Sequence, residues 1–245
     1  IFSWILLFII VMAIFYPDQS THEGFNTIDN MAHQIGFKPV YGGNTKHHKI
    51  DSIQLAENSH GYDKCVFLDK KAQFCNNHKR YHDHLVKVAS VLLGKITNVL
   101  IIGGGDGQFI DCLTKFQDVK RIDVVDIDKS MMKIIKKHFN NELFPKDDRV
   151  SILAGDVQEM IESAPNKFYN LIIVDIRKEI YKNSTINNSS FLRLCRNKLE
   201  LHDNLLIKCG GMSKEESKRN QDDEKEDTNN MRKIATSVKK TFPFY

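Results

Sequence analysis

The sequence predicts an α/β protein in which a doubly wound parallel sheet follows a small β-domain. From Asn98 onward, apolar runs of strand length alternate with segments of helical spacing, as repeated βα units do. The first run, residues 99–102, is apolar at every position and ends in glycines, which is typical of a parallel strand buried on both faces. Before Asn98, short apolar runs separated by a turn-like segment indicate a small β unit.

The composition is that of a globular chain. The 245 residues include 35 Lys and Arg and 31 Asp and Glu, which gives a net charge of +4, and 41% are hydrophobic. These values exclude a collagen, a mucin-like stalk, a wholly disordered chain and a protein with many membrane spans. Because a basic nucleic-acid binder concentrates far more charge on one face, no nucleic-acid partner is expected.

The chain is expected to divide into four parts: an apolar segment at 1–16, a polar linker at 17–45, the small β-domain at 46–76 and the α/β domain at 77–245. The first part is apolar apart from Ser3, which predicts a transmembrane or signal-anchor segment. We therefore expect membrane association through this segment, with a cytoplasmic protein as the alternative.

The last part of the α/β domain departs from the βα pattern. Residues 213–230 carry seven acids and four bases and almost no apolar side chain, so we expect a disordered, charged insertion. One last helix is predicted after it, with Ile234, Val238 and Phe242 on its apolar face. The strands that normally close such a sheet do not follow, so we expect a truncated C-terminus.

The individual elements follow from apolar spacing. In the small β-domain, strands are predicted around Ile50, Ile53 and Leu55 and over 65–68, with a turn at 58–61 between them. A helix is predicted over 80–93. In the α/β domain, the predicted strands are 99–102, 122–125, 150–153, 171–174 and 205–207, and the predicted helices are 109–116, 131–139 and 191–199.

The five cysteines include no Cys-x-x-Cys pair. Most of them lie among apolar neighbours in the sequence, which is typical of buried free thiols in a reducing compartment.

The strongest functional motif is Gly103-Gly104-Gly105-Asp106-Gly107, which follows a predicted strand and opens a predicted helix. Glycines in that place let the backbone turn tightly and approach a ligand closely. An acidic residue about 20 positions further on typically binds a ribose hydroxyl, and Asp126 lies 19 residues after Gly107. The sequence therefore predicts a nucleotide or nucleoside site.

The charge of Asp106 limits which class of nucleotide or nucleoside this site can bind. A carboxylate at this position would repel a phosphate, whereas it could pair with an amine or a sulfonium, so an adenosyl-sulfonium compound fits better. Asp156 and Asp175 follow the next two strands, and with Asp106 and Asp126 they place four carboxylates at the carboxyl ends of strands, where open α/β sheets bind ligands. Any one of them could instead be the N-cap of a helix.

These residues resemble the motifs of the polyamine aminopropyltransferases, the spermidine and spermine synthases. Residues 99–107 resemble the specific glycine signature of that family. Weaker flanking motifs that resemble theirs occur in the same order along the chain, at 68–73, 81–83, 126–128, 155–156 and 174–175. The resemblance extends from about Lys49 to Gly211.

The resemblance implies a β-domain packed on a methyltransferase-like Rossmann domain, in a homodimer. It implies transfer of an aminopropyl group from decarboxylated S-adenosylmethionine to a polyamine acceptor, with release of methylthioadenosine and without a metal ion. Asp175 would be the catalytic residue. By matched position, the residues that would hold the donor are Gln73, His82, Gly103, Gly105, Asp106, Gly107, Asp126 and Asp156.

The chain also departs from the family pattern. Lys70 stands where the family has glycine, and aspartates stand at positions 83 and 126 where it has glutamate. The acidic loop of spermidine synthases is replaced by Asp175-Ile176-Arg177-Lys178, which argues against putrescine as the acceptor. Two alternatives stay open: a methyltransferase that uses ordinary S-adenosylmethionine, and a non-catalytic relative. Asp106 argues against the first of these, and the two new cations favour the second.

Overall fold

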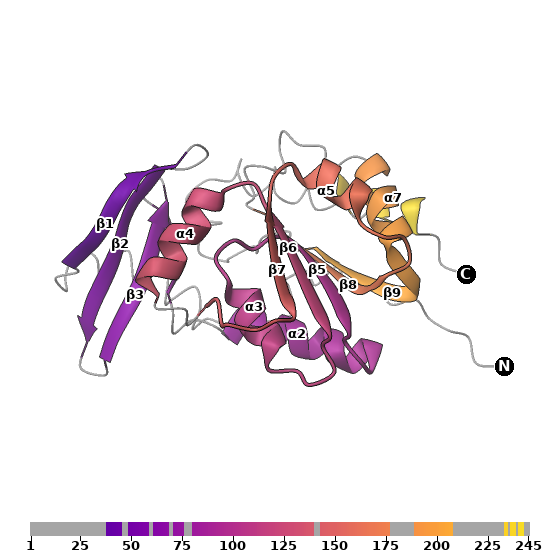
Figure 1. The fold of residues 1–245 in the computed structure, drawn as a ribbon, viewed down its shortest axis with the longest axis horizontal. Helices are drawn as coiled ribbons and strands as arrows, with labels where there is room; N and C mark the ends of the chain where they lie inside the picture. Colours follow the sequence, from indigo (N-terminus) through magenta and orange to yellow (C-terminus); the bar gives the residue numbers. More distant parts are fainter. Residues whose placement is uncertain are drawn as a thin grey trace.

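The computed structural model describes residues 38–45, 49–58, 61–68, 71–75, 80–139, 143–176 and 189–207, together with helical positions between 233 and 242. These residues form a four-stranded antiparallel sheet and a five-stranded parallel sheet that is covered by helices on both faces (Figure 1). The predicted fold class, an α/β Rossmann-like domain preceded by a small β region, is therefore confirmed.

The antiparallel sheet contains two strands that the sequence predicts and two that it does not. Its strands run in the order β1 (Lys38–Asn44), β2 (Lys49–Asn58), β3 (Gly61–Leu68) and β4 (Lys71–Cys75). β2 and β3 lie where they were predicted. β1 lies in the segment that was expected to be a linker. It was not predicted because Pro39 and Gly43 interrupt the alternation of its side chains, and its pairing with β2 shifts register twice.

The parallel sheet contains all five predicted strands. They are β5 (Asn98–Gly103), β6 (Arg121–Asp126), β7 (Val150–Ala154), β8 (Tyr169–Asp175) and β9 (Leu199–Ile207). Their order in the sheet is β7-β6-β5-β8-β9, so the chain first winds outward from β5 on one side and then returns to wind outward on the other. Ligands of such sheets bind where the winding reverses, which here is between the carboxyl ends of β5 and β8.

Two apolar layers, one on each face of the sheet, pack the helices against it. Alternate residues of each strand contribute their side chains to one layer or the other. In β5, Val99 and Ile101 belong to one layer, whereas Leu100 and Ile102 belong to the other. Figure 1 shows α2 (Arg80–Leu93), α3 (Gln108–Thr114) and α4 (Lys129–His138) on the first side, and α5 (Val157–Ser163) and α7 (Ser189–Lys198) on the second. All of these helices except α5 were predicted.

The predicted last helix packs on the side of α5 and α7. Ile234, Val238 and Phe242 are buried in the same apolar cluster as Phe191 and Leu192 of α7. The Phe242 amide donates to the Val238 carbonyl over 2.8 Å, as it does in an α-helix.

The antiparallel sheet is joined to the parallel domain at α4. The Lys64 ammonium of β3 donates to the His138 carbonyl over 2.9 Å, and the rings of Tyr41 and His138 lie 5.3 Å apart. The hydroxyl of Thr45 donates to the carboxylate of Asp128, which also caps the first turn of α4. These contacts attach the small sheet to the element that follows β6.

The predicted anchor at 1–16 and the charged insertion at 213–230 lie outside the described residues. Among the helices that the structure describes, none is long and apolar enough to cross a membrane.

The cysteines correct one expectation. Cys112 and Cys195 are free and buried, as predicted, but Cys65 is disulfide-bonded instead of being a free thiol. Cys65 lies on β3 directly opposite Cys75 of β4. The sequence does not reveal this disulfide, because the hairpin that places Cys75 opposite Cys65 was not predicted.

We expect the buried thiols to make the fold sensitive to alkaline pH. Burial raises the pKa of the Cys195 thiol to about 12, whereas an exposed thiol in the unfolded chain ionises near its ordinary pKa of about 8.5. The stabilisation is therefore complete below that ordinary pKa and is lost as the pH rises toward the folded value.

The measurement is urea unfolding of the wild-type chain and of Cys195→Ala at pH 8 and pH 10. Between these pH values the wild type should lose on the order of 2 kcal/mol more stability than the variant, since only the wild type carries this thiol. Equal losses in the two proteins would contradict the expectation.

One arginine connects the turn before β7 to the segment that joins α3 to β6. The Arg149 guanidinium donates to the carbonyls of Thr114, Phe116 and Val119 over 2.7, 3.0 and 2.9 Å. Its Nη2 also lies 2.6 Å from the Asp147 carboxylate, and the pair lowers the pKa of that carboxyl group. The side chain thus satisfies three backbone carbonyls at once, at the end of α3 and in the segment that follows it.

Replacing Arg149 with alanine should destabilise the protein by about 2–4 kcal/mol, because each of these hydrogen bonds involves a charged donor. Arg193→Ala, on the exposed face of α7, is the matched control and should change stability by less than about 0.5 kcal/mol. Urea midpoints with unchanged slopes measure the difference, and similar midpoints for both variants would show that the network contributes little.

Candidate functional site

The glycine motif forms a close contact between the ends of β5 and β8. The Gly104 amide donates to the Asp175 carbonyl over 3.1 Å, and a Cβ added at Gly103 would lie 2.2 Å from that same oxygen. Gly103, Gly104 and Gly107 adopt φ values of 81°, 70° and 81°, which other L-residues rarely adopt. The motif therefore needs glycine both for its backbone conformation and for the approach of β8.

Asp126 holds this turn from the end of β6. Its Oδ2 accepts from the Gly105 amide over 2.9 Å, and its Oδ1 accepts from the Asp128 amide over 2.7 Å. The residue is only 8% exposed, so the carboxylate is fixed in position. Because a carboxylate oxygen has two lone pairs, it can accept more than one hydrogen bond, so a carboxylate fixed in this way is suited to a ligand hydroxyl.

Three predicted site residues meet at one point. Ligand atoms of His82, Asp106 and Asp175 all lie within 4.8 Å of one another, and we call these residues the His82–Asp106–Asp175 cluster. They come from α2, from the glycine turn and from the end of β8. His82 and Asp175 are buried, Asp106 is half-buried, and the ring of His82 meets the ring of Phe109 edge-on at 4.6 Å.

The cluster is suited to a cation. Two carboxylates that converge at short range repel each other, and a positive group placed between them relieves that repulsion. An ammonium, a sulfonium and a divalent metal ion would all satisfy this electrostatic demand. The neighbouring glycine turn and Asp126 add groups that suit a nucleoside, so the whole site favours an organic cation that carries a ribose.

Asp156 is the N-cap of α5, the structural alternative that the sequence left open for each of the four carboxylates. Its carboxylate caps α5 by accepting from the amides of Gln158 and Glu159 over 2.8 and 3.3 Å, and the side chain is exposed. It nevertheless lies near Asp126, because the Gly155 amide donates to the Asp126 carbonyl over 3.2 Å. Asp156 is thus at the same edge of the sheet as the other site residues.

Some predicted residues cannot be placed in the site. The backbone of Gln73 lies on β4, whereas its side chain is outside the described part of the structure. Arg177 and Lys178 also lie outside the described residues.

Sequence reasoning missed Gln108. This residue opens α3 directly after the glycine motif, and it is 1% exposed. The backbone amide of Gln108 donates to Asp106 Oδ1 over 3.0 Å, and the side-chain Nε2 lies 3.5 Å from Asp106 Oδ2. The signal in the sequence was a large polar residue at the first helical position, next to a residue already predicted to bind a ligand.

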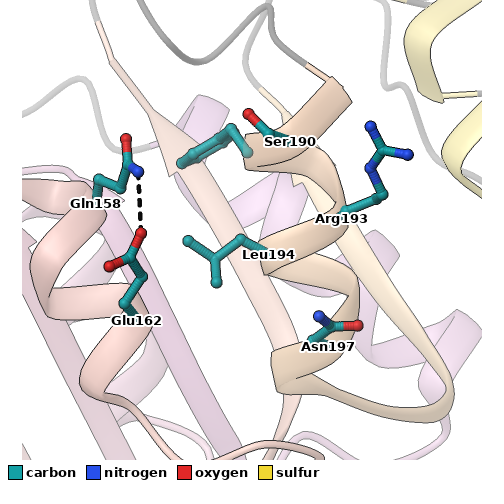
Figure 2. Close-up of a pocket in the computed structure, with 7 residues that line it drawn as sticks. Gln158, Glu162, Ser190, Arg193, Leu194 and Asn197 are labelled. Carbon is teal, nitrogen blue, oxygen red and sulfur yellow. Dashed lines mark hydrogen bonds between the residues drawn. The ribbon is translucent and has the colours of Figure 1, made fainter.

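A hollow elsewhere on the surface is separate from this site. It has a volume of about 290 Å³ and lies between Gln158 and Glu162 of α5 and the facing side of α7 (Figure 2). The Gln158 amide donates to the Glu162 carboxylate over 2.9 Å across one turn of α5. No predicted site residue lines this hollow.

Comparisons with known proteins agree with the geometry. The family model described as "Spermine/spermidine synthase domain" matches residues 78–243. A polyamine aminopropyltransferase of Clostridium perfringens is 32% identical over 139 residues, which cover 56% of this chain and 47% of that protein. One from Hydrogenobaculum is 36% identical over 140 residues, which cover 56% and 48% of the two chains. The chain thus spans about half the length of the curated relatives it matches.

A solved structure supports the fold. The spermidine synthase of Thermotoga maritima matches with a TM-score of 0.66 and 20% identity, covering 85% of this chain and 66% of that one.

The contact between Gly105 and Asp126 can be tested by adding one methyl group. A Cβ at Gly105 would lie 2.6 Å from Asp126 Oδ2, so Gly105→Ala must displace the carboxylate and lose its hydrogen bond. We expect a loss of about 1–3 kcal/mol in stability, as for other overpacked positions.

Gly155→Ala is the matched control, since its Cβ would meet Met160 Sδ at an ordinary 3.7 Å. This variant should be within about 1 kcal/mol of the wild type. Urea unfolding of both variants measures the difference, and equal stability would show that the turn can move away from Asp126 at no cost.

Proposed function

The chain belongs to the spermine/spermidine synthase family, and from this premise we propose that it transfers an aminopropyl group from decarboxylated S-adenosylmethionine to an amine of a polyamine. The second product would be methylthioadenosine. The observation that carries the proposal is the His82–Asp106–Asp175 cluster, which lies beside a glycine turn held on Asp126.

In the proposed complex, the nucleoside lies along the carboxyl ends of β5, β6 and β7. Gly103, Gly105 and Gly107 let the backbone approach it closely, and the fixed Asp126 accepts hydrogen bonds from the ribose hydroxyls. Asp156 accepts from the adenine amino group at the end of β7. Gln73 is proposed to help hold the donor, which rests on its matched position in the sequence.

Asp106 selects the donor. Decarboxylated S-adenosylmethionine ends in a primary ammonium group, which pairs with the Asp106 carboxylate. Ordinary S-adenosylmethionine carries an additional carboxylate on the same carbon as its amine, and Asp106 would repel it. The charge that excludes a phosphate from this turn therefore also favours the decarboxylated donor.

Asp175 is the proposed catalytic residue. A neutral amine of the acceptor attacks the methylene carbon of the aminopropyl arm beside the sulfonium, a C–N bond forms and the C–S bond breaks. The bonding electrons stay on sulfur, which becomes the neutral thioether of methylthioadenosine. Asp175 takes the proton that the amine loses and holds that amine in line, while His82 helps to hold donor and amine.

The acceptor is proposed only as a polyamine amine. Arg177 and Lys178 replace acidic or small residues of the loop that follows the catalytic aspartate in spermidine synthases, which disfavours putrescine. We also propose a homodimer, as the resemblance implies. Membrane association through residues 1–16 remains a hypothesis from the sequence.

The test combines ligand binding with turnover by the full chain. Decarboxylated S-adenosylmethionine and methylthioadenosine should both raise the unfolding temperature, and ordinary S-adenosylmethionine should do so weakly. A stronger effect of ordinary S-adenosylmethionine would support methyl transfer instead. If none of the three stabilises the folded chain, the proposed function is wrong and a non-catalytic role is favoured.

Asp175→Asn should lower kcat by about 10²–10⁴-fold while methylthioadenosine still binds, because the variant loses the base and keeps the nucleoside contacts. Asp118→Asn, an exposed residue paired with Lys95, is the control and should leave kcat unchanged. Product formation is followed by mass spectrometry with a panel of polyamines. Unchanged turnover of Asp175→Asn would remove Asp175 from the mechanism.

A further inference from the structure

Gln108 is a buried polar residue with one atom that the fold does not satisfy. The side chain is 1% exposed, and its Oε1 is buried without a hydrogen-bond partner among the described residues. Leaving a buried carbonyl oxygen unpaired is costly, and such atoms in native proteins call for an explanation.

The orientation of the carboxamide is fixed by its neighbour. Nε2 lies 3.5 Å from Asp106 Oδ2, and turning the group over would place a carbonyl oxygen against a carboxylate, which is repulsive. The unpaired atom is therefore the acceptor Oε1, on the same planar group that faces Asp106. The backbone amide of Gln108 also donates to Asp106 Oδ1 over 3.0 Å, so the two residues form one unit.

A primary ammonium group fits this unit. It carries three N–H donors, and a single carboxylate in the geometry of Asp106 does not use all of them. Oε1 supplies a neutral acceptor beside that carboxylate. A ligand carboxylate would meet oxygen acceptors on both Asp106 and Gln108, so it would be repelled more strongly than by Asp106 alone.

We propose that Gln108 determines donor specificity by accepting an N–H from the ammonium group at the end of the donor's three-carbon arm, beside Asp106. This inference rests on the proposed function and adds to it a contact made by this chain's own Gln108. Methylthioadenosine lacks the arm, so its binding is independent of this contact.

The test measures how Gln108→Met changes the affinity for two nucleosides. Methionine keeps the length of the side chain and removes both amide atoms. The dissociation constant of decarboxylated S-adenosylmethionine should rise about tenfold to a hundredfold, as for the loss of a hydrogen bond to a charged group, whereas that of methylthioadenosine should change less than about twofold. The preference for the decarboxylated donor over ordinary S-adenosylmethionine should fall as well.

Two further variants keep the result interpretable. Gln117→Met makes the same substitution at an exposed position after α3 and should change neither constant. Gln108→Ala removes the same amide group without introducing a methionine side chain. It should give the same selective loss as Gln108→Met, which separates the loss of the amide from any poor packing of methionine. The free Gln108→Met protein should unfold at the same temperature as the wild type or a higher one, because the unpaired oxygen is gone.

The outcomes separate the two proposals. A selective loss of the decarboxylated donor supports the role of Gln108. Equal weakening of both nucleosides, or no change in either, overturns it while the proposed function stands. A wild-type chain that binds neither nucleoside overturns the proposed function and this inference with it.

Discussion

The site depends on the carboxylate of Asp126. It accepts from the amide of Gly105 in the glycine turn and from the amide of Asp128 in the next loop, so one buried side chain sets the distance between two strand ends. Asp128 in turn caps α4 and accepts from the hydroxyl of Thr45, the residue that follows β1. The position of the turn, the start of α4 and the attachment of the antiparallel sheet are therefore linked through a few hydrogen bonds.

The second constraint is the approach of β8 to the glycine turn. Since the Gly104 amide donates directly to the Asp175 carbonyl, the end of β8 is fixed to the turn that carries Asp106. This contact brings the side chains of Asp106 and Asp175 together although they are far apart in the sequence. The same close approach that requires glycine thus creates the concentration of negative charge that a cationic substrate would neutralise.

The sequence predicts the parallel half of the fold well because its strands are buried on both faces. Runs such as 99–102 and 171–174 are apolar throughout, and their short length and their content of valine and isoleucine favour a buried strand over a helix. β1 and β4 were missed because short antiparallel strands with polar residues carry little local signal, and β1 is also interrupted by Pro39 and Gly43. The disulfide of Cys65 was missed for the same reason, as its cross-strand neighbour lies on β4.

The proximity of some of the predicted site residues could also be inferred from the sequence. Asp106, Asp126 and Asp175 follow strands, and parallel strands bring their carboxyl ends to one edge, so their proximity could be inferred. That His82 of α2 reaches this edge followed only from a resemblance, because helix packing is not encoded in local spacing. Gln108 had no recognisable motif, and its importance appears only when its burial and its contact with Asp106 are known.

The arrangement of these groups explains which carbon the proposed reaction would use. A sulfonium has three carbon substituents, and the enzyme selects one by where it delivers the nucleophile. In the proposed complex, Asp126 would hold the ribose end of the donor, and Asp106, with Gln108, would hold the far end of the aminopropyl arm. A ligand atom of Asp175 lies within 4.8 Å of one of Asp106, whereas Asp126 ends β6 on the other side of β5. In the proposed complex, an amine held by Asp175 would therefore meet the arm. In the proposed reaction, the placement of two aspartates therefore decides between aminopropyl and methyl transfer, on a fold that could support either.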